Sequence, residues 1–530
     1  MATRSFWGWG DEEAALGAEE LEALGAFAAA RLGVTGLTLA PAPRIEDLRL
    51  PASRFTPSGS LAALFSVDPR DRALHTHGRA FRDIVRGLEG DFRSAPAAVA
   101  HPKTEDDVRR VLDLCEAEDL AVIPFGGGSS TVGGVEARGL DRPAVSLDLG
   151  GLDGVLEVDR ASRAARIQAG ILGPRLEEAL RPHGLTLRHY PQSFEFSSLG
   201  GWIATRSGGH YATGRTHIDD FVEALRVVTP SGLVATRRLP ASGAGPQPER
   251  LFIGSEGALG VITEAWMRLQ ERPSFRASAT VRFADFLKAA EAARRLAQSG
   301  LEPQNCRLVD ATEAMNNGAG DGTRHLLLVA FESADHPLDA WMTRALEICR
   351  EAGGEVSEGA GRTRTGAEGD REGSSGAWRQ MFLRAPYLRD GLVRFGLVVD
   401  TFETAVTWDR FEGFYAGVLE ATQRAAASAA GSAVVTCRLT HVYPDGAAPY
   451  FTVLAPGRRG SLVQQWDEIK RAASEAILAL GGTITHHHAV GRDHQPFYER
   501  ERPDLFGEAL RGVKRVLDPR GIMNPGVVVT

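Results

Sequence analysis

The sequence predicts an α+β protein of two domains. Three observations support this fold class. The chain of 530 residues is longer than a single domain with one hydrophobic core usually is. Its contents of 43% hydrophobic and 24% charged residues are typical of globular proteins. Helical and strand-like patterns alternate along most of the chain. These patterns predict an N-terminal helical region (1–90), a first domain (91–272), a second domain (273–500) and a C-terminal segment (501–530) that returns to the first domain.

The N-terminal region contains an aromatic cluster and a predicted helix. The stretch DEEAALGAEELEALGAFAAARLG has Leu and Ala at helical spacing and stops at Gly33. Phe6, Trp7 and Trp9 precede it, and they could pack onto the body of the protein or form a tip that contacts a membrane or a partner. Packing is favoured because aromatic side chains dominate such internal contacts.

The first domain begins with a helix and a buried strand. In TEDDVRRVLDLCEAEDL, Thr104 and Asp107 have the spacing of a capping box. The apolar positions that follow share one helical face: Val108, Val111, Leu112 and Cys115. The runs LAVIPF and ARIQAGI predict strands, a helix begins near Pro174, and ALRVVTPSGLVAT predicts two strands joined by a turn.

The second domain repeats this alternation. FRASATVRF predicts a strand, ADFLKAAEAARRLAQSG a helix and HLLLVAFE another strand. The polar, glycine-rich stretch from Val356 to Ala377 predicts a long loop, which could be a lid or simply disordered. FGEALRGVKRVLDPRGIMNPG predicts a helix, a turn and a loop at the end of the chain.

Composition excludes several classes of protein. The net charge of -8 argues against nucleic-acid binding. The cysteines lie far apart without metal-ligand spacing, so we expect buried thiols and no metal site: Cys115, Cys306, Cys349 and Cys437. The N-terminus resembles no signal or transit peptide, and no run of about 18 apolar residues occurs. We therefore expect a cytoplasmic protein that could still associate peripherally with a membrane.

The stretch PFGGGSSTVGG, Pro124 to Gly134, predicts an anion-binding loop after a strand. Glycines let backbone N–H groups approach a ligand, and successive N–H groups form a concave anion site. A Walker loop would end in Gly-Lys-Ser/Thr, which is missing, and a Rossmann fingerprint would open a helix, which TVGGVEARGLDRP does not predict. The loop therefore fits neither common nucleotide motif.

Two further glycine-rich segments give the loop a context: RHYPQSFEFSSLGGWIATRSGGHYATGRTHIDDFVEALRVVTPSG and LFIGSEGALGVITEAWMRL. Together the three resemble the flavin-binding domain of the vanillyl-alcohol oxidase and para-cresol methylhydroxylase (PCMH) superfamily. The resemblance implies a two-domain flavoenzyme, with an FAD-binding domain and an α+β cap domain, and non-covalent FAD. The residues it assigns to FAD are Pro124, Gly126, Gly127, Gly128, Ser129, Ser130, Thr131, Pro191, Gln192, Ser193, Ser197, Gly200, Gly201, Thr205, Ser207, Gly208, Glu256, Gly257, Leu259, Gly260 and Ile262.

The C-terminal half distinguishes two members of this superfamily. FAD-dependent 2-hydroxyacid dehydrogenases carry a histidine- and glutamate-containing metal site, but Tyr450 stands in place of its second histidine and His487 in place of its glutamate. The segments RLVD, APYLRDGLVRFGLVVDTFETAVTWDR, CRLTHVY and THHHAVG instead resemble the alkyldihydroxyacetonephosphate synthase family over most of the chain. Gln192 replaces that family's usual acid, and Ala489 replaces its usual glycine.

This second resemblance implies a transferase of ether lipid biosynthesis. The reaction replaces the acyl chain of acyl-dihydroxyacetone phosphate by a long-chain fatty alcohol, without net redox change, and N5 of FAD traps the substrate. The triplet His486, His487 and His488, with Tyr450 and His189, is implied in proton transfer. On a strand, His486 and His488 would share one face. Arg438 and Arg307 are the candidates for binding the phosphate.

Two alternatives of other classes remain. One is an FAD-dependent 2-hydroxyacid dehydrogenase of the D-lactate or glycolate type, or an alcohol oxidase. The other is a lipid-binding module without turnover, which has no need of Tyr450 and the histidine triplet beside Arg438. We also expect a homodimer.

Overall fold

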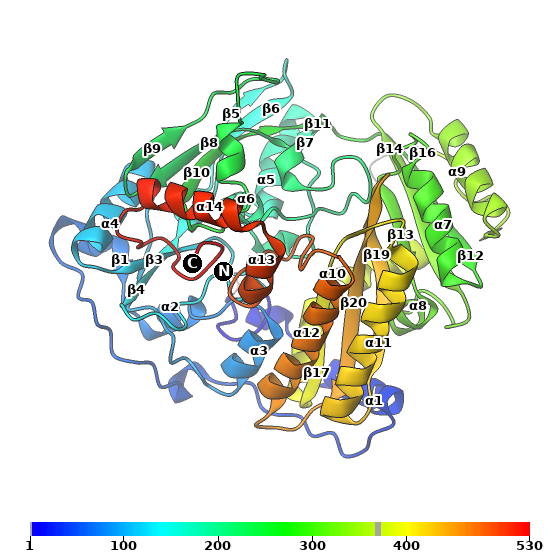
Figure 1. Cartoon of the computed structure of the whole chain (residues 1–530), viewed down its shortest axis with the longest axis horizontal. Coiled ribbons are helices and arrows are strands. Elements are labelled where there is room, and N and C mark those ends of the chain that lie inside the picture. The colour runs from blue at the N-terminus through cyan, green and yellow to red at the C-terminus, as the bar shows by residue number, and fades with distance from the viewer. Residues whose placement is uncertain (1–2, 366–372) are drawn as a thin grey trace.

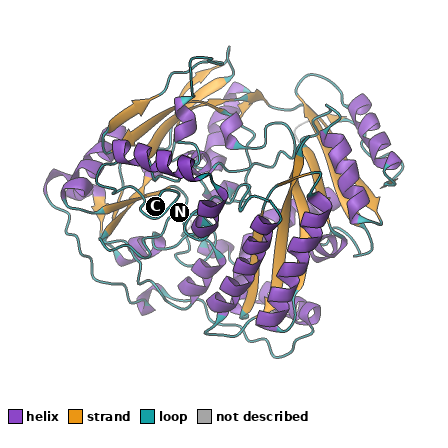
Figure 2. Ribbon diagram, viewed as in Figure 1, coloured by secondary structure: helices purple, strands orange, loops and turns teal. Residues whose placement is uncertain are grey.

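The computed structural model describes residues 3–365 and 373–530, without the side chains of residues 373–383. Its strands form four sheets, which divide between two regions of the molecule (Figure 1, Figure 2).

The first sheet carries the glycine-rich loop. Its strand order is β1 (Phe65–Ser66), β2 (Ala98–Ala100), β4 (Ala144–Asp148) and β3 (Ala121–Phe125), and the last three are parallel. Helix α4 (Glu105–Ala117) precedes β3, with Thr104 as its N-cap in a capping box and the four predicted apolar residues buried. These predictions are confirmed.

The second sheet is antiparallel and lies beside the first (Figure 1). Its order is β5 (Val155–Asp159), β6 (Ala164–Gln168), β10 (Val261–Arg268), β8 (Val222–Thr229) and β9 (Gly232–Ala235). Helices α5 (Gly173–Leu180) and α6 (Leu199–Thr205) pack near it, and β7 (Leu185–Thr186) pairs with β11 (Gln270–Glu271).

The end of the chain lies against this first region. Helices α13 (Gln495–Glu501) and α14 (Asp504–Leu517), coloured red in Figure 1, cross it before the C-terminus. The N–H of Val122 in β3 donates to the carbonyl of Ile522 at 2.8 Å, and the N–H of Asn524 donates back to Val122 at 2.9 Å. Ile522 and Met523, near the C-terminus, therefore belong to the hydrophobic core beside the first sheet.

The third large unit is a nine-stranded antiparallel sheet. Its main path is β15 (Glu355–Val356), β12 (Phe275–Phe283), β14 (His325–Ser333), β13 (Asn305–Val309), β19 (Val434–Val442), β20 (Gly446–Pro456) and β17 (Leu397–Glu403), while β16 (Arg364–Thr365) pairs with β12 and β18 (Val406–Thr407) with β20. Four helices cover one face with the largest apolar core: α7 (Phe286–Ala297), α9 (Asp339–Glu351), α11 (Phe411–Ala430) and α12 (Leu462–Ala479). The other face carries α8 (Ala311–Asn316).

The N-terminal region touches both units. Helix α1 (Ala18–Leu32) ends at Gly33, whose φ of 65° is left-handed, as predicted, and packs on α10 (Gly373–Arg394). Helices α2 (Pro69–Leu74) and α3 (Phe81–Leu88) follow β1. Phe6 and Trp9 are buried, so the predicted packing of the aromatic cluster is confirmed.

The stretch predicted as one long loop, Val356 to Ala377, is only partly a loop. Residues 366–372 lie outside the described residues. Before them, β15 and β16 pair with β12, and after them α10 begins at Gly373. Backbone pairing with β12 therefore orders residues whose polar, glycine-rich composition gives no strand pattern.

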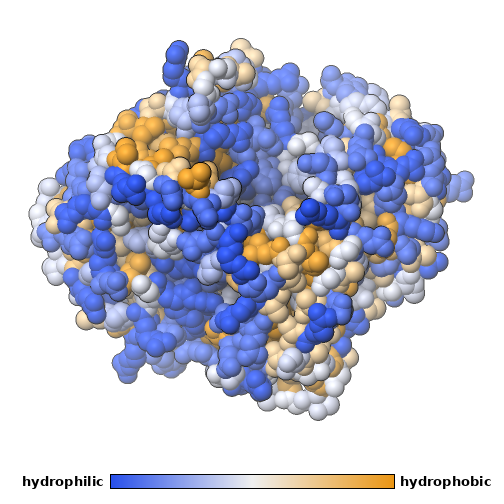
Figure 3. Space-filling model, viewed as in Figure 1, coloured by the Kyte–Doolittle hydropathy of each residue, from blue (hydrophilic) through white to orange (hydrophobic). Residues whose placement is uncertain are grey.

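The face shown in Figure 3 is mostly hydrophilic, with orange areas at its upper left and near its centre. An orange area covers the part in which Figure 1 labels β8, β9 and α14. Leu233 on β9 and Leu505, Phe506 and Val516 on α14 are exposed. Within residues 3–365 and 373–530, no helix combines the length and apolar character needed to cross a bilayer.

Candidate functional site

A row of side chains crosses the nine-stranded sheet. Val309 on β13 is paired with Arg438 on β19, Arg438 with Tyr450 on β20, and Tyr450 with Glu403 on β17. Residues in register share a face, so these four side chains lie on the face away from the four covering helices. Arg307, two residues before Val309, shares that face.

Positive charge gathers at one end of the row. The Arg438 guanidinium lies 3.8 Å from the centre of the Tyr450 ring and donates to Glu313 on α8. The Tyr450 hydroxyl donates to Thr401 at 2.9 Å. Burial and the nearby Arg438 lower the pKa of Arg307 to about 10, so both guanidiniums stay charged at neutral pH. The structure thus brings together the two arginines predicted to bind phosphate.

A β-bulge adds a histidine to the row. Between Leu439 and His441 the pairing of β19 with β20 shifts by one residue, so His441 faces Ala448. Ala448 is two residues before Tyr450, and His441 therefore lies on the same face as Arg438, although it is the third residue after Arg438 in the chain. In a regular strand His441 would point into the opposite core.

The histidine triplet lies on a bend and not on a strand, so the alternation considered for a strand does not apply. The buried carboxylate of Glu403 accepts the backbone N–H groups of His486 at 2.6 Å, His487 at 3.1 Å and His488 at 2.8 Å. It also accepts the hydroxyl of Thr485 at 2.6 Å. Three successive N–H groups turned toward one carboxylate cannot alternate as in a strand.

A second buried carboxylate holds the other end of this segment, residues 485–491, which we call the histidine loop. Glu256, from the turn before β10, accepts the N–H groups of Val490 at 2.8 Å and Gly491 at 2.9 Å. Burial raises the pKa of Glu256 to about 7. Between the two anchors, Ala489 has a φ of 77°, in the left-handed region that favours the glycine expected there. Glu256, assigned to FAD by resemblance, thus directs its carboxylate at the loop.

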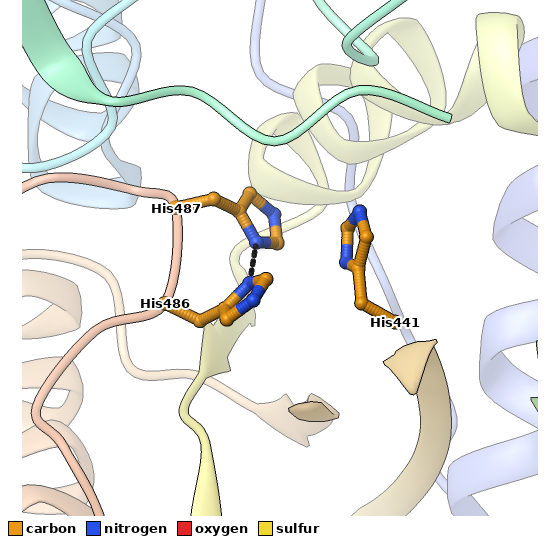
Figure 4. A group of neighbouring side chains, drawn as sticks. All are labelled: His441, His486 and His487. Atoms are coloured by element: carbon orange, nitrogen blue, oxygen red, sulfur yellow. Dashed lines mark hydrogen bonds between the residues drawn. The ribbon is translucent and has the colours of Figure 1, made fainter. Parts of the chain in front are cut away.

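The side chains of the loop form a hydrogen-bonded histidine cluster with His441, and Figure 4 shows the three rings facing one another. Nδ1 of His486 and Nδ1 of His487 lie 3.0 Å apart. Nε2 of His486 lies 2.6 Å from the hydroxyl of Tyr443 and 3.0 Å from Nε2 of His217, which comes from the first domain. Both nitrogens of His486 are therefore engaged.

Burial keeps this cluster uncharged. Desolvation lowers the pKa of His487 and His488 to about 4, and it also lowers the pKa of His441 and His486 well below the usual value. Imidazoles that are neutral at pH 7 can accept protons or coordinate a metal. One ring nitrogen of each of His441, His486 and His487 lies within 4.8 Å of the others, and both ring nitrogens of His486 take part in hydrogen bonds.

Four residues of the site were given no role from the sequence: Glu403, His441, Tyr443 and His217. All four lie inside segments that carry the resemblance to the superfamily or to the family, and Tyr443 is one of the residues that match a family motif. Their roles depend on the strand register, the bulge and the contact between domains, which no local pattern reports.

The glycine loop offers unpaired backbone donors. Within the described part of the chain, none of the N–H groups from Gly126 to Thr131 donates a hydrogen bond. A Cβ at Gly127 would clash with the carbonyl oxygen of Phe196, and Gly128 has a φ of 67°. The loop is thus pressed against the 196–198 segment with its N–H groups free, which fits a pyrophosphate. The Ser130 hydroxyl instead accepts the N–H of Gly134 at 2.9 Å.

The other residues assigned to FAD lie around this loop. The Ser197 hydroxyl donates to the Ser193 carbonyl at 2.8 Å, and that of Thr205 to the Gly201 carbonyl at 2.8 Å. Leu259 and Ile262 are buried in the core beneath β10, and a Cβ on Gly257 would lie 2.8 Å from Pro124. The remaining members occupy the same turns and the start of α6: Ser129, Pro191, Gln192, Gly200, Ser207, Gly208 and Gly260.

His189 lies apart from the triplet. Its Nε2 is 2.8 Å from the hydroxyl of Ser207, and its ring is buried against Trp202 and Phe221. Burial and the nearby His217 lower its pKa to about 3. The structure therefore connects His189 to the histidine cluster through His217 and not by direct contact.

A cavity of about 1020 Å³ borders the cluster at Tyr443. Its walls include Arg410, Asp445, Gly482 and Arg500. None of the residues predicted for cofactor binding or catalysis lines it, so it is not the predicted site.

Comparisons with known proteins agree with this geometry. A family model described as FAD binding domain matches residues 96–237, and one described as FAD linked oxidases, C-terminal domain, matches residues 272–528. The alkyldihydroxyacetonephosphate synthase of Caenorhabditis elegans is 30% identical over 489 residues, 86% of this chain and 80% of the relative. A solved alkyldihydroxyacetonephosphate synthase structure matches with a TM-score of 0.82 at 27% identity, covering 98% of each chain.

The fold extends to more distant flavoenzymes. p-Cresol methylhydroxylase with substrate bound matches with a TM-score of 0.68 at 15% identity, over 88% of this chain and 94% of the other. This likeness concerns the fold alone. The predicted two-domain PCMH-type fold and the prediction of FAD as cofactor are confirmed.

Proposed function

Because the chain belongs to the alkyldihydroxyacetonephosphate synthase family, we propose that it replaces the acyl chain of acyl-dihydroxyacetone phosphate by a long-chain fatty alcohol. The observation that supports this activity best is the pairing of two buried arginines with a neutral histidine cluster on one face of the sheet. This arrangement suits a substrate that carries a phosphate and loses a proton.

Bound FAD supplies an electrophilic centre that amino-acid side chains lack. The residues that would hold it are the free N–H groups from Gly126 to Thr131, at the pyrophosphate, and the segments around Ser197 and Gly208. Gly208 lies close to the cluster, since a Cβ on it would be 3.2 Å from both His441 and His487. The flavin segment and the histidine loop therefore border the same space.

Arg307 and Arg438 would bind the substrate phosphate. Each guanidinium presents a planar fork to phosphate oxygens, and in a buried site charge-assisted hydrogen bonds are strong. Glu313 pairs with Arg438 and holds it over the Tyr450 ring. Arg307 and Arg438 carry two positive charges and Glu313 carries one negative charge, so the group has an excess positive charge that favours binding of an anion.

His487 is the candidate that removes the substrate proton. Its Nε2 makes no hydrogen bond with any described residue, and its side chain is 17% exposed. Arg438 and Arg307 are among its electrostatic neighbours, so a phosphate held by them would place substrate beside the ring. Because its pKa is about 4, His487 is neutral at pH 7 and able to accept a proton.

Anaerobic turnover tests the reaction. The purified FAD-containing protein is incubated with palmitoyl-dihydroxyacetone phosphate and hexadecanol, while the ether product is followed by mass spectrometry and the flavin by its absorbance. Product without lasting bleaching is expected. Absence of product, together with bleaching by D-lactate or glycolate, would instead identify a 2-hydroxyacid dehydrogenase.

Two variants sharpen the test. Arg438→Lys is expected to raise KM for the acyl substrate, because lysine lacks the planar fork, whereas His487→Asn is expected to lower kcat at least 100-fold. His183→Asn, on an exposed turn of the first domain, is the matched control and should change neither. Equal effects of the three variants would contradict the assigned roles.

We also propose a homodimer in the cytoplasm that associates peripherally with membranes. The long-chain alcohol partitions into membranes, and the exposed Leu505, Phe506 and Val516 of α14 are suited to touch a bilayer surface. Light scattering measures the mass, and flotation with phosphatidylcholine vesicles measures association. Replacement of Leu505 and Phe506 by serine should abolish flotation, and a monomeric mass would refute the dimer.

A further inference from the structure

A second group of buried side chains lies behind the glycine loop and has no part in the proposed reaction. It comprises His77 after α2, Asp83 in the first turn of α3, and Glu136 in the segment that follows the loop. Their side chains are at most 1% exposed, and one potential ligand atom of each lies within 4.8 Å of the others. Residues distant in the sequence therefore converge on one enclosed point.

Each of the three residues uses one polar atom and leaves the other without a partner. Nε2 of His77 lies 2.9 Å from the carbonyl of Asp91, Oδ2 of Asp83 accepts the N–H of Ala80 at 3.1 Å, and Oε2 of Glu136 accepts from Arg86 at 3.0 Å. Nδ1 of His77, Oδ1 of Asp83 and Oε1 of Glu136 are buried and make no hydrogen bond.

The tautomer of His77 follows from its contact with a carbonyl. A carbonyl only accepts, so Nε2 carries the proton and Nδ1 presents a lone pair. A histidine that donates its other N–H to a carbonyl is in the arrangement of a metal ligand. Nδ1 of His77 therefore presents a lone pair, as do Oδ1 of Asp83 and Oε1 of Glu136 when no proton is held between the two carboxyl groups.

Such an arrangement costs free energy unless something positive lies at its centre. Burial and the adjacent Glu136 and Asp493 carboxylates raise the pKa of Asp83 well above its ordinary value. One proton shared between Asp83 and Glu136 would satisfy two oxygens and leave Nδ1 of His77 unpaired. A cation would satisfy all three atoms.

We propose that His77 Nδ1, Asp83 Oδ1 and Glu136 Oε1 bind a divalent transition-metal ion, Zn²⁺ or Mn²⁺. One imidazole nitrogen and two carboxylate oxygens form a donor set suited to these ions. Bonds of about 2.0–2.2 Å allow two ligand atoms to be up to about 4.4 Å apart, which is close to the 4.8 Å within which one potential ligand atom of each residue lies. Three protein ligands leave room for water.

The ion would brace the glycine loop from behind. Between His77 and Asp83, the N–H of Arg79 donates to the carbonyl of Ser130 at 2.5 Å, and Gly78 packs on the same carbonyl. Glu136 lies six residues beyond Ser130 in the chain. The metal would thus fasten both sides of the segment whose N–H groups hold the pyrophosphate, a structural role independent of the transferase reaction.

Metal analysis of the holoenzyme tests the site. Protein purified without a polyhistidine tag and dialysed against metal-free buffer is analysed by inductively coupled plasma mass spectrometry, before and after equilibration with Zn²⁺ or Mn²⁺. About one ion per chain is expected. Asp83→Asn and Glu136→Gln should each lower this content at least fivefold, whereas His441→Asn, in the histidine cluster, should leave it unchanged.

Two results would overturn the proposal. A wild-type protein that holds no ion under either condition would mean that a shared proton satisfies the carboxyl pair. An ion that both carboxylate variants retain, and that His441→Asn loses, would assign it to the histidine cluster. If the variants do not fold, anomalous diffraction from wild-type crystals decides, because a peak between His77, Asp83 and Glu136 supports the site and its absence refutes it.

Discussion

His487 combines two properties that a base requires at neutral pH. Burial lowers its pKa to about 4, and Nε2 faces no described partner. Because the folded state disfavours the imidazolium, His487 stays neutral down to about pH 5, whereas an unperturbed histidine is half protonated near pH 6.5. The proton acceptor is therefore available across the physiological range.

We predict that the ring of His487 titrates near pH 4. The measurement is an NMR titration of ¹³C-histidine-labelled enzyme, with the signal assigned by its loss in His487→Gln. The spectra of His487→Gln over the same pH range provide the reference. A midpoint of His487 near 6.5 would show that the ring is not desolvated and would remove the electrostatic argument for its role.

Ala489 occupies a backbone conformation that alanine rarely adopts. Its φ of 77° lets the histidine loop turn between its two anchors, and the side chain is 8% exposed. A left-handed alanine costs about 1 kcal/mol relative to glycine, less the greater freedom of glycine in the unfolded chain.

Ala489→Gly is therefore expected to leave the free energy of unfolding unchanged or to raise it by up to about 1 kcal/mol. Ala23→Gly, at an exposed position inside α1, is the matched control and should lower that free energy by about 1 kcal/mol. Urea denaturation of the three proteins measures both changes. Equal losses in the two variants would mean that the loop does not require a positive φ.

At the scale of elements, the histidine loop depends on one carboxylate. Glu403 at the end of β17 accepts three successive N–H groups and one hydroxyl, and its pKa lies well below the usual range despite its burial, with the hydrogen bond from Thr485 to the ionised form among the causes. Since its folded pKa is depressed, the stability that Glu403 contributes is present above about pH 4.5 and is lost only as pH falls through the lower folded value.

Glu403→Gln should release the histidine loop. The amide offers one acceptor and brings donors toward N–H groups, so we expect a loss of about 2–4 kcal/mol in the free energy of unfolding and faster hydrogen exchange at residues 485–488. Glu332→Gln, on β14 of the same sheet, is the control. Exchange at 485–488 that equals the wild-type rate in Glu403→Gln, or accelerates equally in Glu332→Gln, would contradict this anchoring role.

The elements divide into those that local sequence predicts and those that it cannot. The capping box at Thr104 and the alternation in FRASATVRF are local, and α4 and β12 follow them closely. The bulge before His441 arises from pairing with β20, and Glu403 meets a loop 82 residues further along the chain. Such features depend on register and tertiary contact, so sequence motifs located the triplet, Tyr450 and Arg438 but not what holds them.

At the scale of the whole molecule, the candidate site exists only where the two regions meet. The sheet of the second region supplies the arginines, Tyr450 and Glu403, while the first region supplies His217 and Glu256. Glu256 also accepts, through its backbone carbonyl, the side-chain amide of Asn524 at 2.7 Å. The histidine loop is thus fixed to both regions by buried carboxylates whose pKa values shift in opposite directions.

The opposite pKa shifts of Glu256 and Glu403 predict how the stability of the whole chain depends on pH. Burial raises the pKa of Glu256 to about 7, above the value of about 4.5 expected when unfolded. Between these values the folded state binds the additional proton, so the contribution of Glu256 to stability is complete below pH 4.5 and is lost as pH rises through 7.

Glu256→Gln cannot titrate. The free energy of unfolding of the wild type, relative to this variant, should therefore fall by about 1.4 kcal/mol per pH unit between pH 5 and 7. Urea denaturation at pH 5, 6, 7 and 8 measures this difference. The difference between the wild type and Glu403→Gln should show no such slope, because both proteins contain Glu256 and Glu403 is largely ionised in both states over that range. Parallel stability curves for wild type and Glu256→Gln would mean that the two N–H groups of the loop already keep Glu256 ionised when folded.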